Sequence, residues 1–417
     1  MQSNSPQILS LKEQDELSVK ILHSRLDTIL PEAMRQAKLD MWIILCQEDD
    51  YDPVFKTMIP MRTWAPILQM LVFYATPSGV ERINLSMTNL RDLYAKPWTG
   101  VYHTEQWPLL AKIVTERDPQ RIGINTGSVQ WAAGGLTHNL HAQLVACLEP
   151  KYVDRLVSAE AACTYWLSVL SPEELQFYPH VVGITKAIIA QCFSAQTVTP
   201  GITTTDDLQW AFWQISQALG LEQSFIPFFN LVRSNAEKGR YPVEDKIIRP
   251  GDLIHCDVGN RYLGLCSDLQ EWAYVCRVGE QDAPAGLNNL FSQVNRLQHT
   301  FMEAFEAGQT GDQLLNRILT NAKAQDIPAP KVYSHSLGYY LHEPGPLIGL
   351  PWEQKTNPGR GDVPLQHNTT FTMELSIADA VPEWDNQVVN FSAEQDVCFT
   401  EFGCYPLKPL QRAYHLI

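Results

Sequence analysis

The chain has 417 residues, of which 45% are hydrophobic, 18% charged and 10% aromatic. A soluble globular chain of this length exceeds one ordinary hydrophobic core, so two domains are expected. The formal net charge of −15 and the lack of a basic run exclude nucleic acid and an anionic membrane surface as the main partner. No apolar stretch reaches the length of a transmembrane helix, so a membrane partner is not expected either.

The nine cysteines are scattered between Cys46 and Cys404 without a CxxC pair. Several of them lie in apolar stretches that predict buried strands, which indicates reduced thiols in a reducing compartment. The first 20 residues lack a basic segment followed by an apolar one, so no signal peptide is predicted. We therefore expect a cytoplasmic protein.

The first part of the chain alternates helix-like and strand-like segments. Residues 21–37 carry apolar side chains at helical spacing, with Pro31 as a break or kink. Residues 41–45 predict a buried strand, and residues 67–74 and 80–85 flank a hairpin turn. A further strand is predicted at 121–124. This alternation predicts an α/β domain over residues 1–157.

From residue 158 the pattern becomes more helical, and we expect a second domain over residues 158–417. Ser171 and Pro172 begin one helix, and the turn at 199–207 leads into another. Trp210 and Trp213 share one face of that helix, where a core position is expected. After Phe225 the strands return, with one more helix around 290–305.

Four carboxylates lie in stretches that otherwise predict buried strands: Asp257, Asp268, Glu374 and Glu394. An unpaired ionised carboxylate is too costly in a low-dielectric interior, so a shared counter-charge is expected. Turns near 261–264 and 382–385 would place the four acids as two opposed pairs in two hairpins. Solvated charges at strand ends are the alternative.

A metal ion is the simplest counter-charge for such a group. His335 could add a nitrogen ligand, and oxygen-rich donors with one imidazole suit manganese, cobalt or zinc. Carboxylates that bridge imply two ions, which would activate a water molecule for hydrolysis.

The same residues resemble the M24-type metallopeptidases, which include prolidase, aminopeptidase P, methionine aminopeptidase and creatinase. The resemblance covers roughly residues 158–410 and is looser before them. It implies an α/β plus α+β chain, with a creatinase-type N-terminal α/β domain followed by a pita-bread catalytic domain. The matching segments are Asp257-Val258-Gly259, Asp268, the loop His335-Ser336-Leu337-Gly338, His342-Glu343-Pro344, Glu374 and Glu394-Gln395-Asp396-Val397.

The resemblance implies two divalent ions, with manganese favoured over cobalt or zinc. Asp257 would bind one ion, Asp268 and Glu394 would bridge both, and His335 and Glu374 would complete the other. Glu374 would also act as general base on a metal-bridging hydroxide. His342 would contact the substrate carbonyl region.

The implied activity is that of an Xaa-Pro dipeptidase or Xaa-Pro aminopeptidase, which cleaves the N-terminal bond of a small peptide. Homodimers are common in the family. Tyr339 is a candidate for lining the substrate pocket, although aromatic packing explains it equally well.

Several positions depart from the family pattern. Arg240 and Ser392 stand where a substrate-binding histidine and an arginine are usual, and Gln270-Glu271 replaces Thr-Arg. Arg240 could pair with a substrate carboxylate or could be a surface cation on a loop. His255 shares a strand face with Asp257, where it could support the ligand or be an ordinary core histidine.

Because the substrate-binding positions are altered, two alternatives remain. One is a pita-bread hydrolase of a different amide or related bond. The other is a non-catalytic pita-bread scaffold that binds another protein.

Overall fold

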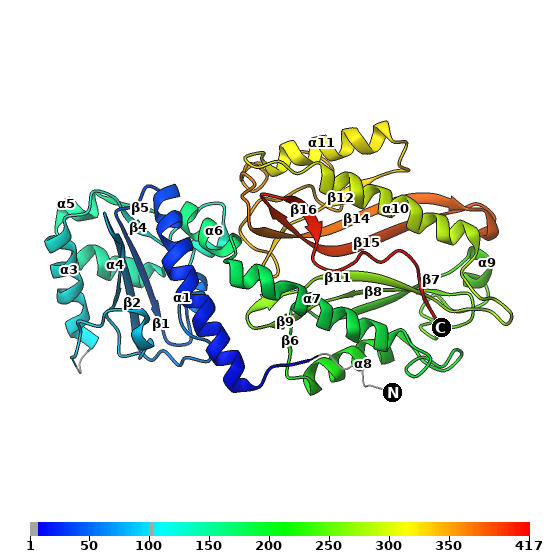
Figure 1. Cartoon of the computed structure of the whole chain (residues 1–417), viewed down its shortest axis with the longest axis horizontal. Helices are drawn as coiled ribbons and strands as arrows, with labels where there is room; N and C mark the ends of the chain where they lie inside the picture. Colours follow the sequence, from blue (N-terminus) through cyan, green and yellow to red (C-terminus); the bar gives the residue numbers. More distant parts are fainter. Residues whose placement is uncertain (1–6, 101–102) are drawn as a thin grey trace. The chain divides into compact units, whose positions relative to one another are not determined.

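The computed structural model describes residues 7–100 and 103–417 and divides into two compact units (Figure 1). The N-terminal unit comprises Leu9–Glu174 with Glu343–Gly345. The C-terminal unit comprises Leu175–His342 and Pro346–Ile417, together with Gln7 and Ile8. This division falls after Glu174, so the predicted boundary between residues 157 and 158 stays a prediction. The prediction that the first 20 residues contain no signal peptide falls partly on residues 1–6, which lie outside the described residues.

The N-terminal unit is an α/β domain with a mixed sheet of strand order β3-β2-β1-β4-β5. Strand β1 pairs antiparallel with β2 and parallel with β4. The strands are Met41–Gln47 (β1), Leu68–Thr76 (β2), Gly79–Asn84 (β3), Ile122–Ile124 (β4) and Leu156–Ser158 (β5). The helices are Leu11–Gln36 (α1), Pro53–Thr57 (α2), Gln106–Arg117 (α3), His138–Cys147 (α4), Pro150–Val153 (α5) and Glu160–Ser168 (α6).

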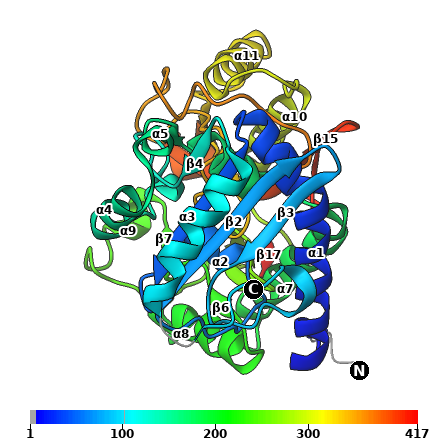
Figure 2. The ribbon, with the colours of Figure 1, turned by 90° about the vertical axis from the view of Figure 1, so that its left-hand side faces the viewer.

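Helices cover both faces of this sheet, with α1 on one side and α3 and α4 on the other (Figure 2). Met41, Ile43 and Leu45 of β1 pack in one core with Leu110 of α3 and Leu144 of α4. The residues between them point to the opposite face, because side chains alternate along a strand. The strand is buried on both faces, and for that reason its sequence is a continuous apolar run.

The C-terminal unit contains a large, curved sheet with the strand order β12-β14-β15-β11-β8-β7. Its strands and those of the smaller sheet β10-β9-β6 are Glu222–Gln223 (β6), Phe228–Val232 (β7), Leu253–Val258 (β8), Asn260–Tyr262 (β9), Leu265–Cys266 (β10), Leu269–Tyr274 (β11), Lys331–Tyr333 (β12), Ser336–Leu337 (β13), Thr369–Val381 (β14), Gln387–Thr400 (β15), Gly403–Pro406 (β16) and His415–Leu416 (β17). The helices are Pro172–Cys192 (α7), Thr205–Ala218 (α8), Asn235–Lys238 (α9), Ala285–Glu303 (α10) and Gly311–Ala324 (α11). In the described part of the chain, no helix has both the length and the apolar character needed to cross a membrane.

Helices α10 and α11 cover one face of the β14–β15 hairpin (Figure 1). Phe371, Met373 and Leu375 of β14 pack into one core with residues of both helices, including Leu290 and Leu315. Strand alternation then directs the even-numbered side chains of β14 away from the helices. Glu374 is one of them, so the packing of the hairpin decides the face on which this acid lies.

Most of the predicted elements are present, and one core prediction is wrong. The helix predicted at 21–37 belongs to α1, which contains Pro31, and the hairpin predicted at 67–85 is formed by β2 and β3. Trp210 and Trp213 are 59% and 37% exposed and stack on each other at 5.5 Å, so they are not core residues. The core side of α8 is formed instead by Leu208 and Phe212.

Candidate metal centre

One continuous row of cross-strand pairs runs over the large sheet. Phe228 of β7 pairs with Asp257 of β8, which pairs with Gln270 of β11. Gln270 pairs with Glu394 of β15, and Glu394 pairs with Glu374 of β14. Paired residues share a sheet face, so three acids and one amide are aligned. Strands that are far apart in the sequence therefore supply neighbouring oxygen ligands.

Asp268 and His335 lie next to this row. Ligand atoms of Asp268, His335 and Glu394 all lie within 4.8 Å of one another, and all three residues are buried. Nε2 of His335 lies 3.8 Å from Oδ2 of Asp268. The backbone N–H of Asp268 donates to Oδ2 of Asp396 at 3.2 Å, which brings a further buried acid to the group.

The two predicted hairpins have different registers. Glu374 lies directly opposite Glu394, as expected. Asp257 lies opposite Gln270 and not opposite Asp268, so the expected direct pairing of the two aspartates is wrong. The reason is the turn, whose central residues Leu263 and Gly264 have positive φ angles of 52° and 85°. A turn centred there shifts the partner of Asp257 by two residues but keeps both acids on one face.

Burial of this acidic group shifts the pKa values upward. Burial raises the pKa of Asp257 to about 6. Burial and the charge of Asp257 raise the pKa of Glu374 to about 7. Burial and then the neighbouring acids raise the pKa values of Asp268 and Glu394 well above their ordinary values. The metal-free chain therefore resists ionising these groups together.

Several oxygen atoms of the group are also without a protein partner. Oδ1 of Asp268, Oε1 of Glu394 and Oδ1 of Asp396 are buried and accept no hydrogen bond from the described residues. Buried polar atoms in proteins are almost always satisfied, so such atoms imply a missing partner. Divalent cations satisfy carboxylate oxygens and neutralise their charge at the same time. The residues present therefore fit a metal site.

The surroundings of His335 keep its ring neutral and leave one ring nitrogen able to bind a metal ion. Its Nδ1 lies 3.1 Å from the backbone oxygen of Ser336, to which it donates, so the lone pair is on Nε2 facing Asp268. Burial, and then the neighbouring His342, lowers the pKa of His335 to about 3. The rings of His335 and His342 meet edge to face, with centroids 4.4 Å apart. His342 itself is exposed to solvent.

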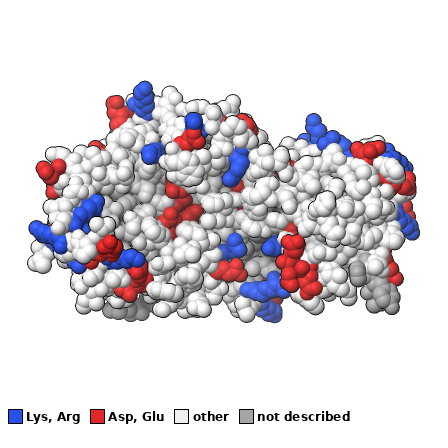
Figure 3. Space-filling view, turned by 180° about the vertical axis from the view of Figure 1, so that it is seen from behind, with Lys and Arg blue, Asp and Glu red and all other residues white. Residues whose placement is uncertain are grey.

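The site is partly open to solvent. Asp257 and Glu374 are half-buried, whereas Asp268, His335 and Glu394 are buried. On the face seen in Figure 3, a group of acidic side chains lies among uncharged residues near the middle of the C-terminal unit. The row is therefore accessible to solvent at its Asp257 and Glu374 side chains.

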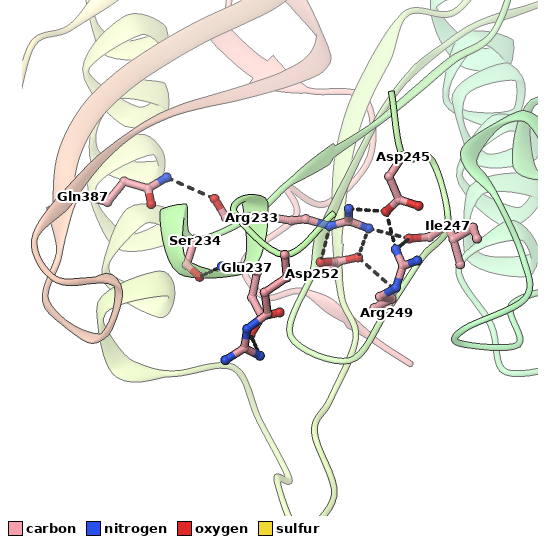
Figure 4. Close-up of polar contacts among 9 residues, drawn as sticks. Arg233, Ser234, Glu237, Asp245, Ile247, Arg249, Asp252 and Gln387 are labelled. Atoms are coloured by element: carbon pink, nitrogen blue, oxygen red, sulfur yellow. Dashed lines mark hydrogen bonds and ion pairs between the residues drawn. The ribbon is translucent and has the colours of Figure 1, made fainter. Parts of the chain in front are cut away.

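Arg240 and Tyr339, which were predicted to bind the substrate, have different surroundings. Arg240 is exposed and pairs with Glu237 at 2.9 Å in a loop after β7. The base of this loop is held by Arg233, which donates to Asp252 at 2.8 Å and to Asp245 at 2.5 Å (Figure 4). This setting favours the surface-cation interpretation of Arg240.

Tyr339 is half-buried, and its ring lies close to Gly264 of the β9–β10 turn. Its position in the substrate pocket stays a prediction.

Three residues at the site had no predicted role. Gln270 donates to Glu394 at 2.9 Å and to Asp257 at 3.4 Å, and Asp396 touches Asp268. Burial lowers the pKa of His342, and the positive charge of the nearby Arg360 lowers it further. Asp396 could have been found from the sequence, because it lies two residues after Glu394 on the same strand face.

A model of metallopeptidase family M24 matches residues 176–401, more than half of the chain. The chain belongs to this family. The predicted family is thereby confirmed, and the matched segment contains every ligand candidate described above. Members of a metallopeptidase family depend on metal ions, in agreement with the buried Asp268, His335 and Glu394 group.

Curated relatives are similar to part of this chain. A Mycoplasma pneumoniae protein named "Putative Xaa-Pro aminopeptidase" is 25% identical over 208 residues, which cover 49% of this chain and 54% of that protein. The chain spans about half the length of the curated relatives it matches.

Two solved structures share the fold over nearly the whole chain. The X-Pro aminopeptidase of Thermotoga maritima aligns with a TM-score of 0.64 and 17% identity, covering 93% of this chain and 100% of that one. The Xaa-Pro dipeptidase of Bacillus anthracis aligns with a TM-score of 0.60 and 16% identity, covering 96% and 100%. The chain therefore has an N-terminal α/β domain and a pita-bread catalytic domain.

Proposed function

We propose that this chain is a dinuclear metal-dependent peptidase that hydrolyses the first bond of short peptides with proline in second position. The observation that carries the proposal is the convergence of buried, unpartnered carboxylate oxygens with a neutral imidazole. Asp257 would hold one ion, Asp268 and Glu394 would bridge both, and His335 and Glu374 would complete the other. Manganese is favoured for this oxygen-rich set, with cobalt and zinc as alternatives.

The bound ions would activate a water molecule and polarise the peptide carbonyl group. Glu374 lies on β14 directly opposite Glu394, from where its carboxylate would act as general base on the activated water. His342 is exposed beside His335, from where its ring N–H would donate to the substrate carbonyl region.

Two further residues suggest which substrates fit. Phe228 lies directly opposite Asp257 and is 56% exposed, so its ring would contact the side chain of the first substrate residue. Arg360 would bind the terminal carboxylate of a short peptide, because its guanidinium group matches a carboxylate in shape and charge. Together they favour a dipeptide or tripeptide with an apolar first residue.

The proposal is tested by metal analysis followed by digestion of a peptide library. The purified chain should retain up to two divalent ions, and with Mn²⁺ added it should release the first residue from Xaa-Pro peptides, as read by mass spectrometry. Cleavage confined to other sequences would favour the alternative of a hydrolase with a different amide substrate. Metal binding without cleavage of any library member would contradict the peptidase.

The hydrolase of a different amide is kept as a second candidate because the substrate-binding positions differ from the family pattern. Arg240 pairs with Glu237 on the surface, and Ser392 contacts His255 at 3.1 Å. The non-catalytic scaffold is less consistent with buried acids that each have one oxygen without a hydrogen-bond partner among the described residues.

A cellular compartment and an oligomeric state are proposed together with the activity. The cysteines of the described residues are all free, which supports a reducing compartment such as the cytoplasm. A homodimer stays a prediction that light scattering of the purified chain can test.

A further inference from the structure

A set of uncharged polar side chains lies beside the acids of the candidate centre. Gln270 is placed between the two acids contributed by β8 and β15. Its side-chain N–H group donates to Oε2 of Glu394 at 2.9 Å and to Oδ2 of Asp257 at 3.4 Å. The amide therefore ties together acids of two strands that are not neighbours in the sheet.

The orientation of this amide decides whether it attracts or repels the acids. Its nitrogen end donates hydrogen bonds, whereas its oxygen end would face the carboxylates with like partial charge. Oε1 of Gln270 lies 3.0 Å from Nε2 of His255. A proton on this ring nitrogen satisfies the oxygen and holds the amide with its nitrogen end toward the acids.

His255 is itself held on several sides. Nδ1 lies 2.9 Å from Oδ1 of Asn230, and Nε2 also lies 3.1 Å from Oγ of Ser392. A neutral ring carries one proton, so with that proton on Nε2 the Asn230 amide satisfies Nδ1 by turning its N–H end toward the ring. The ring packs against Trp272 with centroids 4.6 Å apart. Trp272 in turn donates from its indole nitrogen to the backbone oxygen of Ser392 at 2.6 Å. The histidine therefore has one orientation that its neighbours define.

We propose that His255 is a positioning residue for the metal centre and acts through Gln270, which sets the directions of the Asp257 and Glu394 carboxylates. This inference rests on the metal centre of the proposed function and adds two residues to it. Groups that orient metal ligands from behind typically change metal affinity about 10-fold to 100-fold when they are removed. Replacement of an ordinary core histidine would change only the stability of the chain and not its metal affinity.

Cobalt titration of the full chain separates these two roles without any substrate. Co²⁺ bound to carboxylate and imidazole ligands absorbs visible light, so its dissociation constant and its spectrum report on ligand geometry. We expect His255→Phe, which keeps a ring beside Trp272, to weaken Co²⁺ binding about 10-fold and to change the visible spectrum. His255→Gln restores a side-chain N–H donor and should recover most of the affinity.

The control is Ile254→Ala, on the opposite face of the same strand. Ile254 is fully buried, so this change lowers the unfolding temperature through lost packing and should leave the dissociation constant within about threefold. Equal Co²⁺ affinity and spectra in His255→Phe and the native chain would overturn the positioning role while leaving the peptidase intact. A native chain that binds no Co²⁺ would overturn both.

Discussion

Asp268 shows how a single residue of the proposed centre would favour metal binding at the expense of the stability of the metal-free chain. It is buried, one of its oxygens has no partner among the described residues, and the acids around it add to the effect of burial on its pKa. An ionised carboxylate in this position destabilises the metal-free chain and becomes favourable only with a cation beside it.

Replacement of Asp268 should therefore have opposite effects on metal binding and on stability. We expect Asp268→Asn to weaken metal binding by more than about 100-fold, which exceeds the effect of replacing a residue that only orients a metal ligand. The metal-free variant should unfold at a higher temperature than the metal-free native chain at pH 8. Metal analysis and thermal unfolding measure the two effects. Glu16→Gln, at an exposed acid, should change neither.

Arg360 offers a second test at the scale of one residue. If its guanidinium group binds the substrate carboxylate, Arg360→Met should lower kcat/KM for dipeptides roughly 10-fold to 100-fold, as expected for a lost charged hydrogen bond. Peptides with an amidated end should be affected much less. Arg240→Met is the matched control, because Arg240 is exposed and pairs with Glu237. Equal losses in both variants would contradict the assignment.

At the scale of elements, Glu271 joins a helix and the last strand to β11. It accepts from Nε2 of His415 in β17 at 2.7 Å and pairs with Lys186 of α7. Glu271 follows Gln270, so it lies on the opposite face of β11 from the candidate metal centre. These two contacts therefore hold the strand that carries Gln270 from the opposite face of the sheet.

This cluster predicts a loss of stability in acid. Burial raises the pKa of Glu271, but the contacts with His415 and Lys186 outweigh burial and hold it below its ordinary value of 4.5. A lowered pKa contributes stability that is present above pH 4.5 and is lost as the pH falls further. Glu271→Gln should cost about 3 kcal/mol at pH 7 and remove this part of the acid dependence, as measured by urea unfolding between pH 3 and 7.

The register of the strands around the site could be predicted only where the position of the connecting turn could be predicted. The β14–β15 hairpin turns at Asp385 and Asn386, which lie in the polar connection that the sequence indicates, and Glu374 and Glu394 meet as expected. The β8–β11 hairpin was misaligned because a turn centre cannot be placed to one residue in Arg261-Tyr262-Leu263-Gly264. Such an error moves a cross-strand partner by two positions but preserves the face.

The side of a helix that faces the core was harder to predict. Trp210 and Trp213 lie on one face of α8, as their spacing indicates, yet that face is exposed. Periodicity identifies which residues share a face, but the packing partner decides which face is buried. Arg360 was missed for a related reason, since its nearness to His342 depends on a long loop that has no periodic pattern.

At the scale of the whole molecule, metal binding should stabilise the chain more strongly as the pH rises. The raised pKa values of Asp257, about 6, and Glu374, about 7, mean that bound protons compete with the ions below neutral pH. A raised carboxyl pKa also means that the metal-free chain loses stability as the pH increases from about 4 toward these values.

Thermal unfolding with Mn²⁺ or EDTA at pH 5.5, 6.5 and 7.5 tests both effects. At 100 times its dissociation constant, an ion that binds only the folded chain adds about 2.7 kcal/mol, so the shift should be several degrees at pH 7.5 and smaller at pH 5.5. Mg²⁺ at the same concentration controls for ionic strength. A shift that does not depend on pH would show that the titrating acids are not the ligands.

The order of strands in the large sheet has a consequence for the synthesis of the chain. The row over that sheet joins β8, made near residue 257, to β15, made near residue 394. A nascent chain on the ribosome therefore carries Asp257 and Asp268 for more than 100 residues before Glu374 and Glu394 are made. The complete set of ligand candidates can therefore come together only after β15 has been synthesised.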